Sequence, residues 1–399
     1  MMNVPAPISH MADGFARMSG QADVILAGQN GPGATNLVTG LAQAKAANSA
    51  VVSIAGALAS GHRYQEAFQE VDQDALFKPV TKKVWTATNT GRVPEMFREA
   101  FREALAPRQG PVQLNPPRDV LSGQAEFEPF QTREQYRPFI APAGAPQAIA
   151  AAVELLMDAR KPVIIAVGGI KNTGGGDQCM ALAEARNRAD VWTRIFKAER
   201  KFYLSKRDAD ADVNAMPIQP SGLFKTLRDV LPRDAAVTMA TDALNFWQPK
   251  SLFTQLDFGL VGFSFAAGLG IKLAAPERPV VSLMGDGGFG MTVSELSTAV
   301  DHGINTVTVV MNNRCWGAEK AYQRDFFAER YIGADISSPP FDKLAELYGA
   351  KGYKATTLDE MAQAIEAALV CGKPAVIDTD VDPSALYSFR RDSFEHRAG

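Results

Sequence analysis

The feature that most constrains the fold is a pair of polar turns, each placed directly after a short apolar run. The first turn, Gly285-Asp286-Gly287-Gly288, follows the run Val280–Met284, and the second, Asn312-Asn313, ends the run that starts at Thr306. Asp286 and Asn313 are 27 positions apart, an interval that holds one helix, expected over Thr292–Asp301. The chain then returns to a neighbouring parallel strand. We therefore expect both turns at the carboxyl edge of one sheet, where α/β folds bind ligands.

The residue types in these turns suit a metal diphosphate. Asp286 offers an anionic oxygen, Asn313 a neutral amide oxygen, and the turn that follows a carbonyl oxygen. Mg²⁺ prefers such a set, completed by phosphate and water oxygens. Gly287 and Gly288 allow the backbone to approach closely, and the expected helix would direct its positive N-terminal end at the diphosphate. A GDG sequence alone is weak evidence, since glycine and aspartate favour turns anyway.

Apolar runs alternate with helical stretches along the rest of the chain, which predicts an α/β fold with a parallel sheet covered on both faces. Between residues 122 and 145 proline and glutamate accumulate as in a linker. Boundaries are therefore expected at 1–121, 122–145, 146–195 and 196–399. Further strands are expected at 24–27, 51–55, 111–114, 162–167, 236–240 and 375–380, and further helices at 34–47, 94–106, 146–159 and 178–189.

Composition excludes several classes of protein. The formal net charge of −3 gives no support to nucleic-acid binding, which usually shows a basic excess. Three separated cysteines without a CxxC pair favour free thiols over a disulfide framework or a zinc site. No apolar run reaches the ~18–20 residues of a membrane span, and the first ten residues lack the features of a signal peptide. We expect a cytoplasmic protein with no membrane or nucleic-acid partner.

The GDG and NN turns together resemble the signature of thiamin-diphosphate enzymes. The stretches His10–Arg17, Gly31–Asn36, Phe68–Glu70 and Gly110–Asp119 are similar to the pyrimidine-binding domain of the acetohydroxyacid-synthase-like superfamily. The resemblance implies a pyrimidine-binding domain over 1–121, a reduced central domain over 146–195 and a diphosphate-binding domain over 196–399. It also implies that Mg²⁺ is held by Asp286, Asn313 and the Cys315 carbonyl. The implied cofactor-binding residues are Gly31, Pro32, Asn36, Val261, Gly262, Gly285, Gly287 and Gly288.

Two local motifs are most similar to the sulfoacetaldehyde acetyltransferase family, which converts sulfoacetaldehyde and phosphate to acetyl phosphate and sulfite. They are Trp316-Gly317-Ala318-Glu319-Lys320 and Phe389-Arg390-Arg391-Asp392. Lys320, Arg390 and Arg391 are candidates for binding the anionic substrates, because guanidinium and ammonium groups match sulfonate and phosphate oxygens. The alternatives are a solvated basic tail for the arginines and a helix-surface neighbour of Glu319 for the lysine. His62 and Gln69 are candidate catalytic residues, although a lone histidine is more often structural.

The chain departs from the family at one catalytic position. Relatives carry a glutamate just upstream of the HMADG stretch, which activates the cofactor, and Pro5 lies near that place here. The expected first strand is also absent, so either the start is mis-set or the protein is a shortened relative. The alternatives are a working acetyltransferase, an acetolactate-synthase-like enzyme or decarboxylase, and a non-catalytic cofactor-binding protein. In the family, the pyrimidine domain of one subunit faces the diphosphate domain of another, which implies a homodimer or homotetramer.

Overall fold

The structure is a computed structural model in which part of the chain is described. The described residues are 5–22, 25–129, 132–135, 143–159, 164–165, 170, 175–185, 198–199, 201–202, 205, 214–239, 244, 246, 248–255 and 258–386.

Contacts divide the chain into two units, which are described separately here. One unit comprises Met1–Pro129 and Asp210–Gly399, and the other comprises Phe130–Ala209. The domain boundaries expected from the sequence remain predictions.

The first half of the larger unit is built on a four-stranded parallel sheet with the strand order β1-β2-β4-β3. Its elements are α1 (Pro5–Ser19), β1 (Ile25–Gly28), α2 (Pro32–Thr35), α3 (Val38–Ala46), β2 (Val52–Ala55), η1 (Ser60–His62), α4 (Gln73–Phe77), β3 (Val84–Thr86), η2 (Thr90–Arg92), α5 (Val93–Leu105), β4 (Val112–Asn115) and α6 (Arg118–Ser122).

Helices cover both faces of this sheet. Val52 and Ile54 of β2 pack with residues of α5, whereas Ala55 packs with residues of α1 and α3. Successive residues of a strand point to opposite faces, so β2 is buried on both sides. The parallel sheet with two covered faces that the sequence predicts is confirmed for this half.

The second half is built on a six-stranded parallel sheet with the strand order β6-β5-β7-β8-β10-β9. Its elements are α11 (Pro220–Val230), β5 (Ala236–Thr238), β6 (Leu252–Phe253), α12 (Phe263–Ala274), β7 (Val280–Gly285), α13 (Asp286–Gly290), η4 (Val293–Glu295), α14 (Leu296–Asp301), β8 (Val307–Asn312), α15 (Gly317–Phe326), α16 (Phe341–Leu347), β9 (Lys351–Ala355), α17 (Leu358–Val370) and β10 (Ala375–Asp380).

The central strand β7 divides its side chains between two hydrophobic clusters. Val281 and Leu283 pack with residues of α11 and α17. Met284 packs instead with residues of α12, α14 and α16. The second sheet is therefore also covered on both faces, as the alternation of strands and helices predicts.

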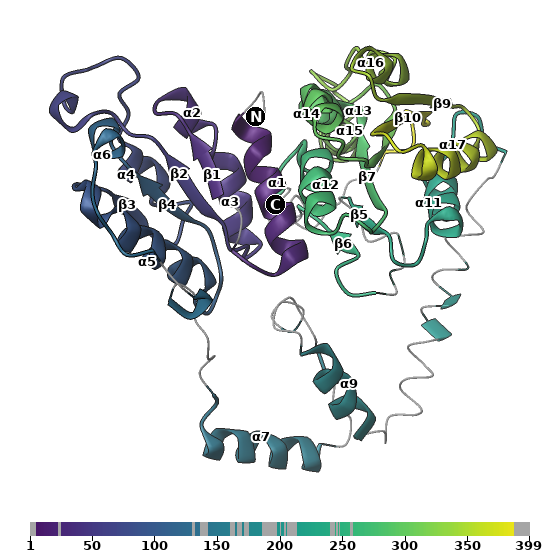
Figure 1. Cartoon of the computed structure of the whole chain (residues 1–399). Coiled ribbons are helices and arrows are strands. Elements are labelled where there is room, and N and C mark those ends of the chain that lie inside the picture. The colour runs from purple at the N-terminus through teal and green to yellow at the C-terminus, as the bar shows by residue number, and fades with distance from the viewer. Residues whose placement is uncertain are drawn as a thin grey trace. The chain divides into compact units, whose positions relative to one another are not determined.

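Helices α1 and α12 pack together within the larger unit (Figure 1). A Cβ atom on Gly14 would lie 2.3 Å from the Ala267 carbonyl oxygen, and one on Gly270 would lie 1.9 Å from the Met11 carbonyl oxygen. The two helices therefore approach backbone to backbone, and only glycine fits at these positions.

The smaller unit contains α7 (Pro146–Asp158), α9 (Gly176–Ala185) and, near its start, the short helix η3 (Arg133–Gln135). The two longer helices confirm the helical stretch expected at 146–159 and residues 178–185 of the one expected at 178–189, whose last four residues lie outside the described ranges. The strand expected at 162–167 falls largely outside the described residues. No helix in the described ranges combines the length and apolar character needed to cross a membrane.

Candidate functional site

The two polar turns lie side by side at the carboxyl edge of the six-stranded sheet. Strands β7 and β8 are parallel neighbours, and Gly285 pairs with Met311 in their register. Asp286 therefore follows β7 at the level where Asn312 ends β8. This arrangement confirms the expectation that both turns meet at one sheet edge.

Three oxygen-bearing groups converge there. The carboxamide atom of Asn313 that faces Asp286 lies 3.2 Å from Asp286 Oδ1 and 3.0 Å from the Cys315 carbonyl oxygen. If the amide is oriented with its nitrogen at this position, that nitrogen donates to both oxygens. If the amide oxygen is at this position, it forms a set of three oxygens with Asp286 Oδ1 and the Cys315 carbonyl. Neighbouring ligands in an octahedron with ~2.1 Å bonds are about 3 Å apart, so the spacing fits Mg²⁺.

Ser338, a residue that the sequence patterns do not single out, determines how Asp286 is oriented. Its hydroxyl donates to Asp286 Oδ2 at 2.5 Å, which leaves Oδ1 facing Asn313. Burial raises the pKa of Asp286 above its usual value, and the bond from Ser338 opposes this shift. A cation at Oδ1 would stabilise the charged form of this buried carboxylate.

Cys315 takes part through its backbone. Burial raises the pKa of its thiol, so the side chain remains neutral while the carbonyl faces Asn313. Within the described residues, no three His, Cys, Asp or Glu side chains gather as a metal site. The set at this edge has one carboxylate, with an amide and a carbonyl as the other groups.

A cavity of about 400 Å³ opens beside these oxygens. A Cβ atom on Gly287 would lie 2.7 Å from the Trp316 ring, so this glycine is required for the indole to pack over the turn. The cavity is lined by Gly285, Gly287, Gly288, Cys315, Trp316 and Val261, among others. With Gly262, six of the predicted diphosphate and metal residues therefore line one cavity.

The chain enters α12 at the same cavity. Gly262 is the N-cap of this helix with a φ of 83°, a left-handed conformation that favours glycine. Val261, half-exposed, precedes it and lines the cavity. The first-turn N–H groups of the 12-residue helix are thus available to an anion.

The helix expected over Thr292–Asp301 is confirmed to within one residue, as η4 (Val293–Glu295) followed directly by α14 (Leu296–Asp301). The chain turns into α13 directly at Asp286, and the non-helical Thr292 separates this short helix from η4 and α14. The N-terminus of α14 therefore does not follow the glycine turn. The helix expected at 34–47 is likewise divided into α2 and α3, with Asn36 and Leu37 between them.

A second cavity, of about 890 Å³, lies on the four-stranded half and brings together two of the predicted residues. His62 and Gln69 both line it, together with Asn30, Phe68 and Arg118. A Cβ atom on Gly31, whose φ is 60°, would lie 2.7 Å from the Gln69 Cβ. The Asn30 amide donates to the Gln69 carbonyl at 3.4 Å. Arg118 is a cation at this site that the sequence patterns do not indicate.

The other cofactor candidates of this half lie in the adjoining turn. Pro32 begins α2, and Asn36 is its C-cap with an exposed side chain. Pro5 is the first residue of α1.

Of the three predicted anion-binding residues, Lys320 lies within the described residues. The ammonium group of Lys320 forms an ion pair with Asp335 at 2.5 Å, and this contact is the main cause that raises its pKa. The positive charge of Lys320 is therefore already compensated by the Asp335 carboxylate. Arg390 and Arg391 lie outside the described residues.

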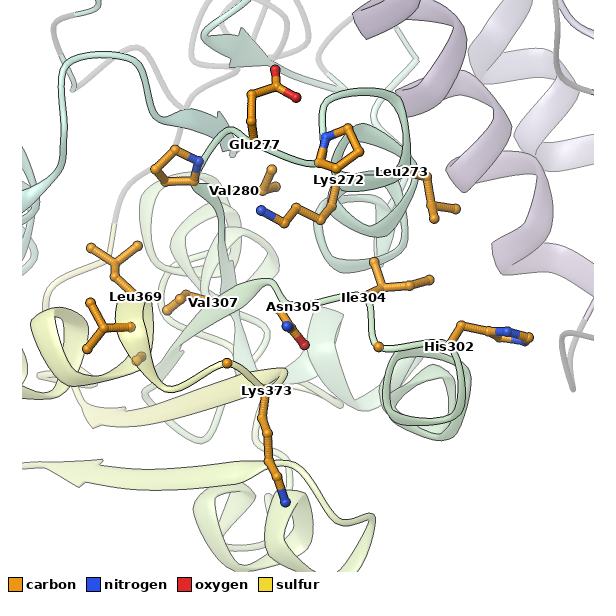
Figure 2. A pocket seen from close by; sticks show the side chains of 16 residues that line it. Lys272, Leu273, Glu277, Val280, His302, Ile304, Asn305, Val307, Leu369 and Lys373 are labelled. Carbon is orange, nitrogen blue, oxygen red and sulfur yellow. The ribbon is translucent and has the colours of Figure 1, made fainter.

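A further cavity, of about 440 Å³, lies at the opposite edge of the six-stranded sheet (Figure 2). Its lining includes Val280 and Val307, the first residues of β7 and β8. Figure 2 shows Glu277, His302 and Lys373 pointing to different sides. The Lys272 ammonium donates to the Arg278 carbonyl at 2.8 Å. Ligands of α/β sheets bind at the carboxyl ends of the strands, so this cavity is not the candidate site.

Both halves of the larger unit contain a stretch that matches a known protein family. Residues 8–76 match the thiamine pyrophosphate enzyme, N-terminal TPP binding domain, and residues 235–379 match the thiamine pyrophosphate enzyme, C-terminal TPP binding domain. The second match contains all of the converging oxygens.

Two curated proteins are similar over nearly the whole chain. A probable acetolactate synthase large subunit from Methanocaldococcus jannaschii is 27% identical, with 94% of this chain and 84% of that protein covered. The sulfoacetaldehyde acetyltransferase of Castellaniella defragrans is 27% identical, with 96% and 87% covered. The first alignment spans 499 positions, whereas the chain has 399 residues, so at least 100 positions of that relative have no counterpart here.

The fold is similar to a solved enzyme structure. The thiamine diphosphate-dependent 4-hydroxybenzoylformate decarboxylase of Rhodococcus jostii RHA1 superposes with a TM-score of 0.82 at 20% identity, covering 96% of this chain and 92% of that one. At this identity the likeness shows the fold alone.

Proposed function

Because the chain belongs to the thiamin-diphosphate-dependent enzymes of the acetohydroxyacid-synthase-like superfamily, we propose that it converts sulfoacetaldehyde and phosphate to acetyl phosphate and sulfite, with Mg²⁺ and thiamin diphosphate as cofactors. The observation that carries the cofactor assignment is the Asn313 carboxamide atom that lies 3.2 Å from Asp286 Oδ1 and 3.0 Å from the Cys315 carbonyl oxygen. The substrate assignment is supported by the 27% identity to the Castellaniella enzyme and by the Trp316–Lys320 motif beside the metal turn.

In this proposal the chain's own residues hold and orient the reacting groups. The three oxygens bind Mg²⁺, and Gly287 and Gly288 leave room for the diphosphate. The first turn of α12 offers N–H groups to the same anion. Gln69 and His62 line the second cavity, and in this proposal they bond sulfonate or phosphate oxygens. When bound, thiamin diphosphate supplies a nucleophilic carbon and an electron sink.

The second candidate is an acetolactate-synthase-like activity, which the equal identity to the Methanocaldococcus protein favours. Decarboxylation of a 2-oxo acid belongs to the same group of reactions. A third candidate is a protein that binds the cofactor without turnover, since Pro5 stands near the place of the activating glutamate.

One set of assays separates these functions. The protein is incubated with Mg²⁺, thiamin diphosphate and either sulfoacetaldehyde plus phosphate or pyruvate. We expect sulfite and acetyl phosphate in equal amounts, with sulfite release dependent on phosphate. Acetolactate or CO₂ from pyruvate, with no sulfite from the first mixture, would support the second candidate instead. Cofactor binding without any product would support the third.

A further inference from the structure

A buried carboxylate on β10 is connected to the two chain segments that carry Asn313 and Ser338. Asp378 is 1% exposed. Its Oδ1 accepts from the Asn312 amide at 3.0 Å, and its Oδ2 accepts from the Phe341 backbone N–H at 3.2 Å. The Lys354 ammonium lies 3.3 Å from Oδ2 and 2.6 Å from Asp380 Oδ1. Both oxygens of this carboxylate are therefore used.

The two donors lead directly to the metal turn. Asn312 immediately precedes Asn313, so its bond to Asp378 anchors the end of β8. Phe341 begins α16, three residues after Ser338, which donates to Asp286 at 2.5 Å. The bonds Asn312–Asp378, Phe341–Asp378 and Ser338–Asp286 link residues 66, 37 and 52 positions apart. Four distant segments, those of Asp286, Asn312, Ser338–Phe341 and Asp378, are thus linked by these bonds.

We propose that Asp378 and Ser338 are positioning residues of the Mg²⁺–diphosphate site, a role that rests on the proposed cofactor. Ser338 fixes the carboxylate of Asp286 so that Oδ1 faces Asn313. Asp378 fixes the two segments that carry Ser338 and Asn313. A buried charge is costly unless paired, and Asp378 is paired with Lys354 and two hydrogen-bond donors. Such outer partners orient metal ligands, and their loss typically weakens metal affinity ~10–100-fold.

The neighbouring serines provide a matched test of the first contact. Ser338→Ala removes the hydroxyl that bonds Asp286, whereas Ser337→Ala removes an exposed hydroxyl one residue away. Mg²⁺ is titrated into full-length protein with thiamin diphosphate present, and heat is measured by calorimetry. We expect Ser338→Ala to bind Mg²⁺ ~10–100-fold more weakly than the wild type. Ser337→Ala should match the wild type.

The aspartates of β10 test the second contact. Asp378→Asn and Asp380→Asn both remove a charge beside Lys354, but only the first alters the acceptor of Asn312 and Phe341 N–H. We expect a tenfold or greater loss of Mg²⁺ affinity for Asp378→Asn and about twofold or less for Asp380→Asn. If Asp378→Asn does not fold, the serine pair decides the proposal.

Replacing Mg²⁺ by Ca²⁺ distinguishes a loss of ligand positioning from a general loss of metal affinity. Mg²⁺ demands near-ideal octahedral geometry, whereas Ca²⁺ accepts flexible geometry, so Ser338→Ala and Asp378→Asn should lose more Mg²⁺ affinity than Ca²⁺ affinity. An equal loss for both metals, or wild-type Mg²⁺ affinity in Ser338→Ala, would overturn the proposal. A wild-type protein that fails to bind Mg²⁺ with thiamin diphosphate would instead overturn the proposed function.

Discussion

His10 is a buried histidine whose surroundings make it sensitive to acid. It is 5% exposed, neither ring nitrogen has a hydrogen-bond partner among the described residues, and its ring lies 6.1 Å from that of Phe263. Burial lowers its pKa to about 4. The neutral imidazole is therefore the form that the folded protein accommodates.

The sign of the pH effect follows from this lowered pKa. Between pH 6.5 and about 4 the unfolded chain binds a proton at His10 that the folded chain does not, so the free energy of unfolding falls as the pH drops. The loss is roughly 3 kcal/mol across this window. Urea denaturation at pH 7 and pH 4 should show a smaller loss for His10→Phe than for the wild type. Equal losses in both proteins would contradict this assignment.

Asp286 is the one anionic group in the oxygen set, so its removal should be severe. In Asp286→Ala, Mg²⁺ loses the one carboxylate of the oxygen set, and the diphosphate charge is left uncompensated. We therefore expect magnesium-dependent binding of thiamin diphosphate to disappear. Asp301→Ala, at the exposed end of α14, is the control and should bind normally. Titration calorimetry checks both. Undiminished affinity in Asp286→Ala would exclude this residue as a ligand.

Sequence patterns predict part of this site and miss part of it for a physical reason. Asp286 and Asn313 directly follow neighbouring strands, so the spacing of those strands brings them together. Ser338 bonds Asp286 from 52 positions away, and Asp378 bonds Asn312, the neighbour of Asn313, from 66 positions away. No spacing rule predicts such contacts, because they depend on how loops and strands pack. The carboxamide geometry of Asn313 is likewise visible only in three dimensions.

At the scale of the elements, buried strands are predictable and exposed ones are not. The strands expected at 280–284, 306–312 and 375–380 agree with β7, β8 and β10 to within one residue at each end. The strand β9, Lys351–Ala355, was not predicted, because its sequence KGYKA lacks an apolar run. It lies at the sheet edge, where pairing with β10 rather than burial maintains the strand.

The α1–α12 contact gives a prediction about stability. Gly270→Ala would place a Cβ atom against the Met11 carbonyl oxygen at 1.9 Å, so the helices must separate. Overpacking of this kind costs about 1–3 kcal/mol. Gly290→Ala is the matched control, since nothing lies within 4 Å of the Cβ that it adds. Thermal denaturation should show a lower midpoint for Gly270→Ala alone; a midpoint equal to the control would refute the close packing.

At the scale of the whole molecule, the fold class and the family are confirmed, whereas assembly remains a prediction. The cavity at Gly285–Cys315 and the cavity at His62–Gln69 share no lining residue among those described. Relatives of this kind place the two half-sites across a subunit interface, and two-fold symmetry is the commonest closed arrangement. Domain boundaries and a cytoplasmic location also stay predictions, because chain-wide composition carries little information about either.

We therefore predict a homodimer or a tetramer of dimers. Light scattering at micromolar protein concentration, with Mg²⁺ and thiamin diphosphate present, should report at least twice the 42.9 kDa chain mass. A mass equal to one chain under these conditions would defeat the prediction.

The packing of α1 also has a consequence for how the protein reaches its native state. Met11 lies in the same hydrophobic cluster as Phe265 and Leu269, more than 250 positions along the chain. Contacts between such distant residues form slowly, since a long loop must close first. During synthesis α1 leaves the ribosome long before its α12 partner, Phe263–Ala274, exists. Helix α1 is thus covered late, and the apolar face that packs on α12 stays open to chaperones or to aggregation until α12 has been made.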